Sequence, residues 1–212
     1  LESTSFPVGR IEFIYFRPFS FKEYLLASGR KGLVETMEEA TTDKPVSVPI
    51  HEALLSELST FCFYGGMPKV LKCLIEDKDP VSAINEQENI ISSYRADFSK
   101  YRSRIDTDII HRTFDGLPRL ASHKITFSKI DPDARADQIK KAIGLLEKAH
   151  VITKVKSTDS GLPLAAGSSD KHYKAIFLDV GLLQRHSDYR YEDWLLQPNL
   201  LSAYQGSIAE QF

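Results

Sequence analysis

One short basic stretch, residues 135–149, carries the side chains with the clearest chemical potential. Its candidate contact residues combine cationic groups with an amide: Arg135, Gln138, Lys140 and Lys141. Guanidinium and ammonium groups bind phosphates, and arginine and glutamine can also read base edges in a DNA major groove. These residue types predict a DNA contact. Asp137 and Glu147 reduce the net charge of the stretch to +2, so a helix that only packs or contacts a protein is the favoured alternative.

Arg10 is a candidate for a different role, the sensing of a nucleotide. An arginine beside a buried strand can stabilise charge on a γ-phosphate. The chain contains no G-x-x-x-x-G-K-[ST] phosphate loop, so Arg10 taken alone is better explained as a surface ion-pair residue. Glu210 is a single carboxylate, and a single carboxylate predicts no catalysis.

The remaining polar residues indicate structural roles. We expect Asp106 to cap a helix and Asp179 to form a turn after a strand. The six histidines form no H-E-x-x-H, and neither G-x-S-x-G nor the Rossmann glycine pattern occurs. Cys62 and Cys73 lack metal-site spacing and are expected to be reduced thiols in a cytoplasmic protein. We therefore expect no metal site and no catalytic residue in this chain.

The elements that must position these residues form a mainly α-helical pattern with small β elements. A strand is predicted over residues 10–16, followed by a capping box in which Ser20 and Glu23 start a helix. Apolar periodicity predicts further helices, and these cover residues 51–64, 68–75, 80–101, 107–120 and 135–149.

Two predicted strands follow helix 135–149. They are VITKV (151–155) and HYKAIFL (172–178), and a Gly/Ser-rich loop separates them. Helix, helix, strand, loop, strand is the order of a winged helix-turn-helix, whose second helix enters the major groove. Winged helices also serve as packing or protein-contact modules, so this order alone leaves both roles open.

Length and charge limit the number of domains and the kinds of partner that the chain can have. The 212 residues suit one or two domains, and the net charge is only −2. Residues 35–94 hold eleven acidic against four basic residues, whereas residues 95–141 hold eleven basic against seven acidic. This change of sign is consistent with one basic working face and equally with two solvated helical faces. No apolar run approaches the roughly 18 residues of a membrane-spanning helix, so we expect no membrane contact.

Seven segments, in this order, resemble one family, the bacterial and archaeal AAA-type ATP-binding proteins that carry a C-terminal domain of unknown function. The segments are PVGRIEFIYFRPFSFKEYLLA, FYGGMPKVL, YRADFSKY, IKKAIGLLEKAHVITKV, GLPLAA, FLDVGLL and GSIAEQF. The match extends over nearly the whole chain. Because the chain begins at Leu1 and not at a methionine, we expect it to be the part of such a protein that follows the Walker motifs.

The resemblance implies four parts. They are the end of the ATPase core (1–34), a helical region (35–120), a winged helix (121–183) and the start of a nuclease-like domain (184–212). ATP and Mg²⁺ would bind to the upstream core in the full-length protein and not to this chain. Arg10 would match the family's arginine before the last core strand. Glu210 would lie on the first nuclease helix, without the other residues of a nuclease site.

Two functions are expected on this basis. The first is a non-catalytic accessory region that joins an ATPase core in cis and contacts DNA through residues 135–149. The second is a protein-interaction or homo-oligomerisation module in which helix 80–101 supplies the contact. Nuclease activity is the weakest expectation, because the residues that would complete its site are absent.

Overall fold

The structure is a computed structural model that describes residues 12, 14–101, 105–158, 168–187, 189–196 and 208–211. These residues are mostly helical and include one two-stranded antiparallel sheet, which confirms the predicted fold class. The elements, in chain order, are α1 (Phe21–Ala27), α2 (Lys31–Glu39), α3 (Val48–Tyr64), α4 (Pro68–Ile75), α5 (Pro80–Asp97), η1 (Phe98–Tyr101), α6 (Thr107–Gly116), η2 (Leu117–Leu120), α7 (Phe127–Ile130), α8 (Ala136–Lys148), β1 (Ile152–Thr158), β2 (Ser168–Phe177), α9 (Val180–His186) and α10 (Tyr191–Leu196).

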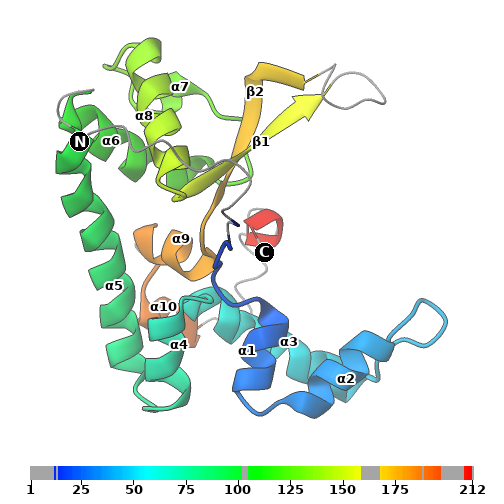
Figure 1. The fold of residues 1–212 in the computed structure, drawn as a ribbon. Helices are drawn as coiled ribbons and strands as arrows, with labels where there is room; N and C mark the ends of the chain where they lie inside the picture. The colour runs from blue at the N-terminus through cyan, green and yellow to red at the C-terminus, as the bar shows by residue number, and fades with distance from the viewer. Residues whose placement is uncertain are drawn as a thin grey trace.

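Helix α5 runs between two groups of elements, as Figure 1 shows. We call α1–α4 the lower lobe, and α6–α8 with β1 and β2 the upper lobe. Helix α9 lies between the lobes, beside the helical turn 208–211 (the C-terminal turn). None of the described helices is both long and apolar enough to cross a bilayer.

The lower lobe begins with the capping box that the sequence predicts. The Ser20 hydroxyl accepts a hydrogen bond from the Glu23 amide, and the Glu23 carboxylate accepts one from the Ser20 amide at 2.7 Å. The hydrogen bonds that the Ser20 amide and the Ser20 hydroxyl donate to this carboxylate lower the pKa of Glu23 below its usual value. Tyr24 then packs against Phe61 of α3, with ring centroids 5.5 Å apart. Sequence periodicity missed α2, which buries only Val34 deeply.

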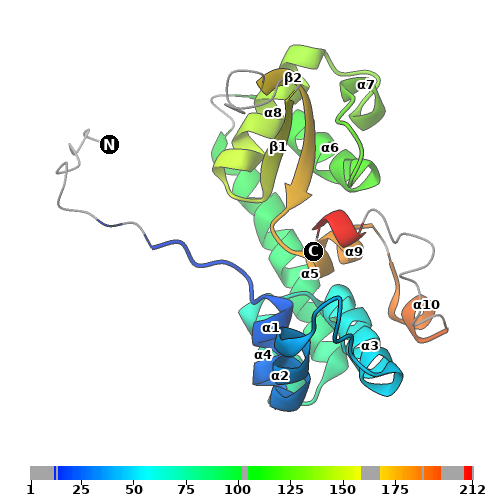
Figure 2. The same ribbon diagram turned by 90° about the vertical axis from the view of Figure 1, so that its right-hand side faces the viewer.

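The predicted strand 10–16 is wrong for its described residues. Residues 12 and 14–16 adopt no regular secondary structure, and Figure 2 shows the segment leading away from α1. Ile14 is 75% exposed and Phe16 is 94% exposed. A strand needs a neighbouring strand for its backbone groups, and β1 and β2 pair with each other. Arg10 lies outside the described residues.

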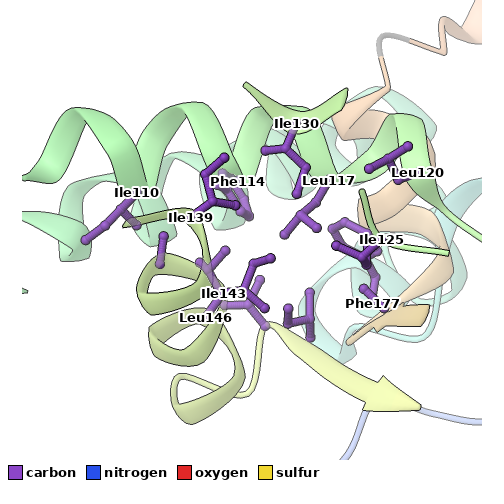
Figure 3. Packing of buried hydrophobic residues seen from close by; sticks show 14 of the residues in the cluster. Ile110, Phe114, Leu117, Leu120, Ile125, Ile130, Ile139, Ile143, Leu146 and Phe177 are labelled. Atoms are coloured by element: carbon purple, nitrogen blue, oxygen red, sulfur yellow. The ribbon is translucent and has the colours of Figure 1, made fainter. Parts of the chain in front are cut away.

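The upper lobe has its own apolar core, drawn in Figure 3. Side chains from α6, η2, α7, α8 and β2 converge there, among them Ile110, Phe114, Leu117, Ile130, Ile139, Ile143, Leu146 and Phe177. Burying each aliphatic side chain contributes about 1.5–3 kcal/mol. Helix α6 ends before Pro118, which interrupts the predicted helix 107–120 and leaves its last turn as a 3₁₀ segment.

The two predicted strands form the hairpin β1–β2. The register pairs Ile152 with Phe177 and Lys154 with Ala175. On the other edge of β2, the Ile125 amide donates to the Tyr173 carbonyl at 3.0 Å. Residues 124–126 therefore contact β2 at one point as a third strand would. The loop 159–167 lies outside the described residues.

Helix α10 returns to the lower lobe. The Trp194 ring stacks on Phe63 of α3 at a centroid distance of 5.1 Å, and its indole N–H donates to the Ser59 hydroxyl at 3.1 Å. This part of residues 184–212, for which the resemblance implied a separate domain, is therefore packed on α3.

Candidate functional site

Helix α8 presents one apolar face and one polar face, which we call the basic face because three lysines lie on it, together with Asp137 and Glu147. Its buried residues are Ile139, Ala142, Ile143 and Leu146. Lys140 and Lys141 point to the opposite side and are exposed, because residues spaced three and four apart share a helix face. The amphipathic pattern that predicted the helix thus also places the two lysines on open surface.

Arg135 and Gln138 lie at the start of α8. Arg135 is the exposed N-cap residue, and its Nε is 3.8 Å from the Asp137 carboxylate. The side-chain carbonyl oxygen of Gln138 accepts a hydrogen bond from the Arg135 backbone amide at 3.2 Å. Both side chains therefore take part in the helix start, whereas Lys140 and Lys141 do not.

Three cations on α8 have no carboxylate within 4.0 Å among the described residues, namely Lys140, Lys141 and Lys148. Two cations elsewhere in the upper lobe are paired. Lys154 lies 2.6 Å from Glu147, and Arg112 lies 3.2 Å from Asp131. Helix α8 thus offers three neighbouring unpaired cations on one face.

The second site is the junction at the start of α9, which we call the α9 junction (Gly65, Gly66, Asp179 and Gly181). The buried Asp179 carboxylate accepts hydrogen bonds from the Leu182 amide at 2.9 Å and from the Gly66 amide at 2.7 Å. Burial raises the pKa of Asp179 above its usual value, and the backbone donors oppose this rise. Asp179 thus caps α9 and also holds the turn between α3 and α4.

Three glycines make this approach possible. Gly65 has φ +77°, and a Cβ there would lie 2.0 Å from a carboxylate oxygen of Asp179. A Cβ on Gly181 would lie 2.4 Å from the Gly65 nitrogen, and one on Gly66 would lie 2.0 Å from the Phe19 carbonyl oxygen. The Phe19 amide also donates to the Gly66 carbonyl at 2.7 Å. The segment before α1, the α3–α4 turn and α9 therefore meet at one point.

Helix α9 also binds three other helices through its polar side chains. The Gln184 amide donates to the Cys62 carbonyl of α3, and Arg185 pairs with Glu88 of α5. The His186 Nε2 lies 3.2 Å from the Asp115 carboxylate of α6. Burial raises the pKa of Cys62 to about 12, so its thiol stays protonated and is no nucleophile.

The C-terminal turn connects the two lobes. Ile208 is buried in the lower-lobe core, while the Glu210 carboxylate pairs with Lys174 of β2 at 2.6 Å. The Gln211 side-chain carbonyl accepts from the Phe177 amide at 2.8 Å, and its amide donates to the Ala175 carbonyl at 3.3 Å. Gln211 thus occupies the outer edge of β2 as a neighbouring strand would, and Glu210 is an ion-pair partner.

No group in the described residues indicates an enzyme site. Asp106 caps α6, as predicted, by accepting from the Asp108 amide at 2.9 Å. No three His, Cys, Asp or Glu side chains of the described ranges gather as metal ligands. A small cavity beside Asp179 and His186 measures about 20 Å³, room for about one water molecule and none for a substrate.

Sequence reasoning missed α9 and with it most of the α9 junction. The signal was present but short, since an N-cap aspartate at position 179 is followed by one apolar turn and by Arg185 and His186 in the last turn. Seven residues are too few for a periodicity to stand out. The contact of Asp179 with Gly66 bridges 113 positions of sequence, and no local pattern encodes it.

Comparison with known proteins gives one match. A family model described as a domain of unknown function, DUF8612, matches residues 55–193. No curated protein and no solved structure matches the chain. The matched range extends from α3 to α10 and includes both α8 and the α9 junction. The chain therefore belongs to the DUF8612 family.

Proposed function

We propose that the chain is the C-terminal accessory region of an AAA-type ATPase and contacts DNA through α8. The observation that carries the DNA contact is the unpaired basic face of α8, formed by Lys140, Lys141 and Lys148. Among the described residues, Lys154 and Arg112 of the upper lobe pair with carboxylates, whereas these three lysines do not. A helix that keeps its lysines unpaired is well suited to bind the phosphates of a nucleic acid.

The arrangement of the upper lobe supports a winged-helix role for α8. Helices α6, α7 and α8 precede the β1–β2 hairpin, and Ile125 adds a strand-like bond to β2. In winged helices the helix before the hairpin enters the major groove. The apolar side of α8 is buried in the core (Figure 3), so its basic side is the one left for a partner.

The segment before α1 supports attachment to an ATPase core. Ile14, Tyr15 and Phe16 are each at least 70% exposed, and consecutive exposed apolar side chains mark a contact surface. Their β-branched and aromatic types suit a strand of another sheet. ATP and Mg²⁺ would bind in that core, so this chain alone should bind no ATP in calorimetry, and tight binding of ATP by the chain alone would contradict the proposal.

The oligomerisation alternative has less support than the DNA contact through α8. Its contact helix, α5 with η1, directs Ile91 and Phe98 inward, where they are 3% and 2% exposed. These two side chains are therefore not available to a second copy. Light scattering that gives a stable dimer would revive the alternative.

The DNA contact is tested by fluorescence anisotropy with a labelled duplex at several salt concentrations. The double variant Lys140→Glu/Lys141→Glu should weaken binding at least about tenfold and lower the slope of log affinity against log salt by about 2. The control is Lys72→Glu/Lys78→Glu, which makes the same charge change on exposed residues of the lower lobe. Equal affinities of the two variants would refute a contact through α8.

A further inference from the structure

Helix α8 contains a glycine that the described structure does not explain. Glycine inside a helix is less stable than alanine, so an interior glycine usually has a conformational or packing reason. Gly144 has no positive φ, and a Cβ built there would meet nothing within 4 Å. By contrast, a Cβ on Gly65 or Gly181 would come closer than 3 Å to other atoms.

Gly144 lies on the basic face of α8. Lys140 and Lys148 are one turn before it and one turn after it on the same side, and Lys141 lies beside them. At 1.5 Å per residue, Lys140 and Lys148 are about 12 Å apart along the axis. A DNA major groove is also about 12 Å wide. The face thus has lysines on both sides of a position without a side chain, and Glu147, which pairs with Lys154, lies beside that position.

We propose that Gly144 is the point at which duplex DNA approaches the backbone of α8 most closely, while the flanking lysines bind phosphates. Glycine permits such an approach because it has no Cβ. The inference rests on the proposed DNA contact and adds Gly144 to it. This residue would contribute through its lack of a side chain and not through a charge. The ligand is a nucleic-acid duplex because three of the four residues one turn away from Gly144 are unpaired lysines, and the fourth, Glu147, pairs with Lys154.

Two substitutions at Gly144 separate binding from folding. Gly144→Ala should raise the melting temperature, since it removes a helix-interior glycine in open space, and should weaken duplex binding. Gly144→Gln should weaken it at least about tenfold, because a long side chain holds the duplex away from the helix. The matched control is Gly32→Ala in α2, where a Cβ also meets nothing within 4 Å. It should raise the melting temperature and leave binding unchanged.

The outcomes distinguish this inference from the proposed function. If Gly144→Gln binds the duplex as the wild type does while Lys140→Glu/Lys141→Glu does not, the inference is wrong and the DNA contact stands. If the wild type itself does not bind the duplex, the proposed function is wrong. Poly-glutamate serves as a second probe. If Gly144→Gln weakens the binding of poly-glutamate and not of the duplex, an acidic protein is the partner and the inference is overturned.

Discussion

The basic face of α8 and the α9 junction use polar groups in opposite ways. On α8 three lysines are exposed and have no carboxylate partner among the described residues. At the α9 junction the Asp179 carboxylate is buried and receives two backbone hydrogen bonds. Charge without a partner is cheap on a surface but costly inside. The exposed lysines therefore need no partner for stability, whereas the buried carboxylate depends on its hydrogen-bond donors.

The same contrast applies to glycine. Gly144 on α8 stands in open space, whereas Gly181 at the junction is required by contacts below 3 Å. Substitutions that enlarge a glycine should therefore weaken the proposed DNA contact on α8 and destabilise the fold at the junction. The following predictions test this division, beginning with the largest effect.

Gly181→Ala should destabilise the fold most. The new Cβ would lie 2.4 Å from the Gly65 nitrogen and from the Tyr64 carbonyl carbon, and both are backbone atoms that cannot rotate away. We expect a loss of at least about 3 kcal/mol in the free energy of unfolding, measured by urea denaturation. Gly144→Ala is the matched control and should cause no loss. Similar stabilities of the two variants would show that packing does not require a glycine at position 181.

Asp179→Ala should cost about 2–3 kcal/mol, because it removes the cap of α9 and leaves the buried Gly66 amide without its acceptor. Asp179→Asn should cost less, since its carbonyl oxygen can still accept one bond. Urea denaturation of the three proteins at one pH measures these costs. A loss below about 0.5 kcal/mol in Asp179→Ala would show that the junction is not held by this carboxylate.

The pH dependence of stability gives a second test of Asp179. Burial raises the pKa of Asp179 in the folded state above the ordinary 3.8, so the folded protein binds this proton more tightly than the unfolded chain does. The stability linked to that proton is present at low pH and is lost as pH rises through the folded-state pKa. Wild type should therefore gain stability relative to Asp179→Asn as pH falls from neutral to about 4. A difference independent of pH would contradict the raised pKa.

Gln211→Ala should have a smaller effect, about 1 kcal/mol, because each of its two bonds is partly accessible to water. Hydrogen exchange at the Phe177 amide should become faster, since its acceptor is lost. Gln211→Glu is the matched control, because it keeps an acceptor for Phe177 and loses only the donor to Ala175. Unchanged exchange in Gln211→Ala would show that the C-terminal turn does not protect β2.

The Lys174–Glu210 ion pair should contribute least. Its side chains are 42% and 43% exposed, and exposed pairs usually contribute about 0–1 kcal/mol. A double-mutant cycle with alanine should give a coupling energy in this range that falls as salt is added. A coupling above about 2 kcal/mol would show that this pair stabilises the fold as strongly as a buried contact does.

The predictable parts of the molecule are those encoded by short-range patterns. The capping box of α1, the amphipathic α8 and the two strands follow from residues close in sequence, as does the exposure of Lys140 and Lys141. Strand 10–16 failed because its residue types suit a strand, while a strand also needs a neighbour that local sequence does not specify. The α9 junction was missed because Asp179 and Gly66 are distant in sequence and meet only in the folded chain.

The contact of Gln211 with β2 has a consequence for solubility. A single side-chain amide fills the two backbone positions, at Ala175 and Phe177, that a further strand would otherwise fill. An open strand edge is a template for intermolecular pairing and aggregation. Proteolytic removal of residues 208–211 would therefore do more than shorten the chain, since it would open this edge of β2 to pairing with a strand of another molecule.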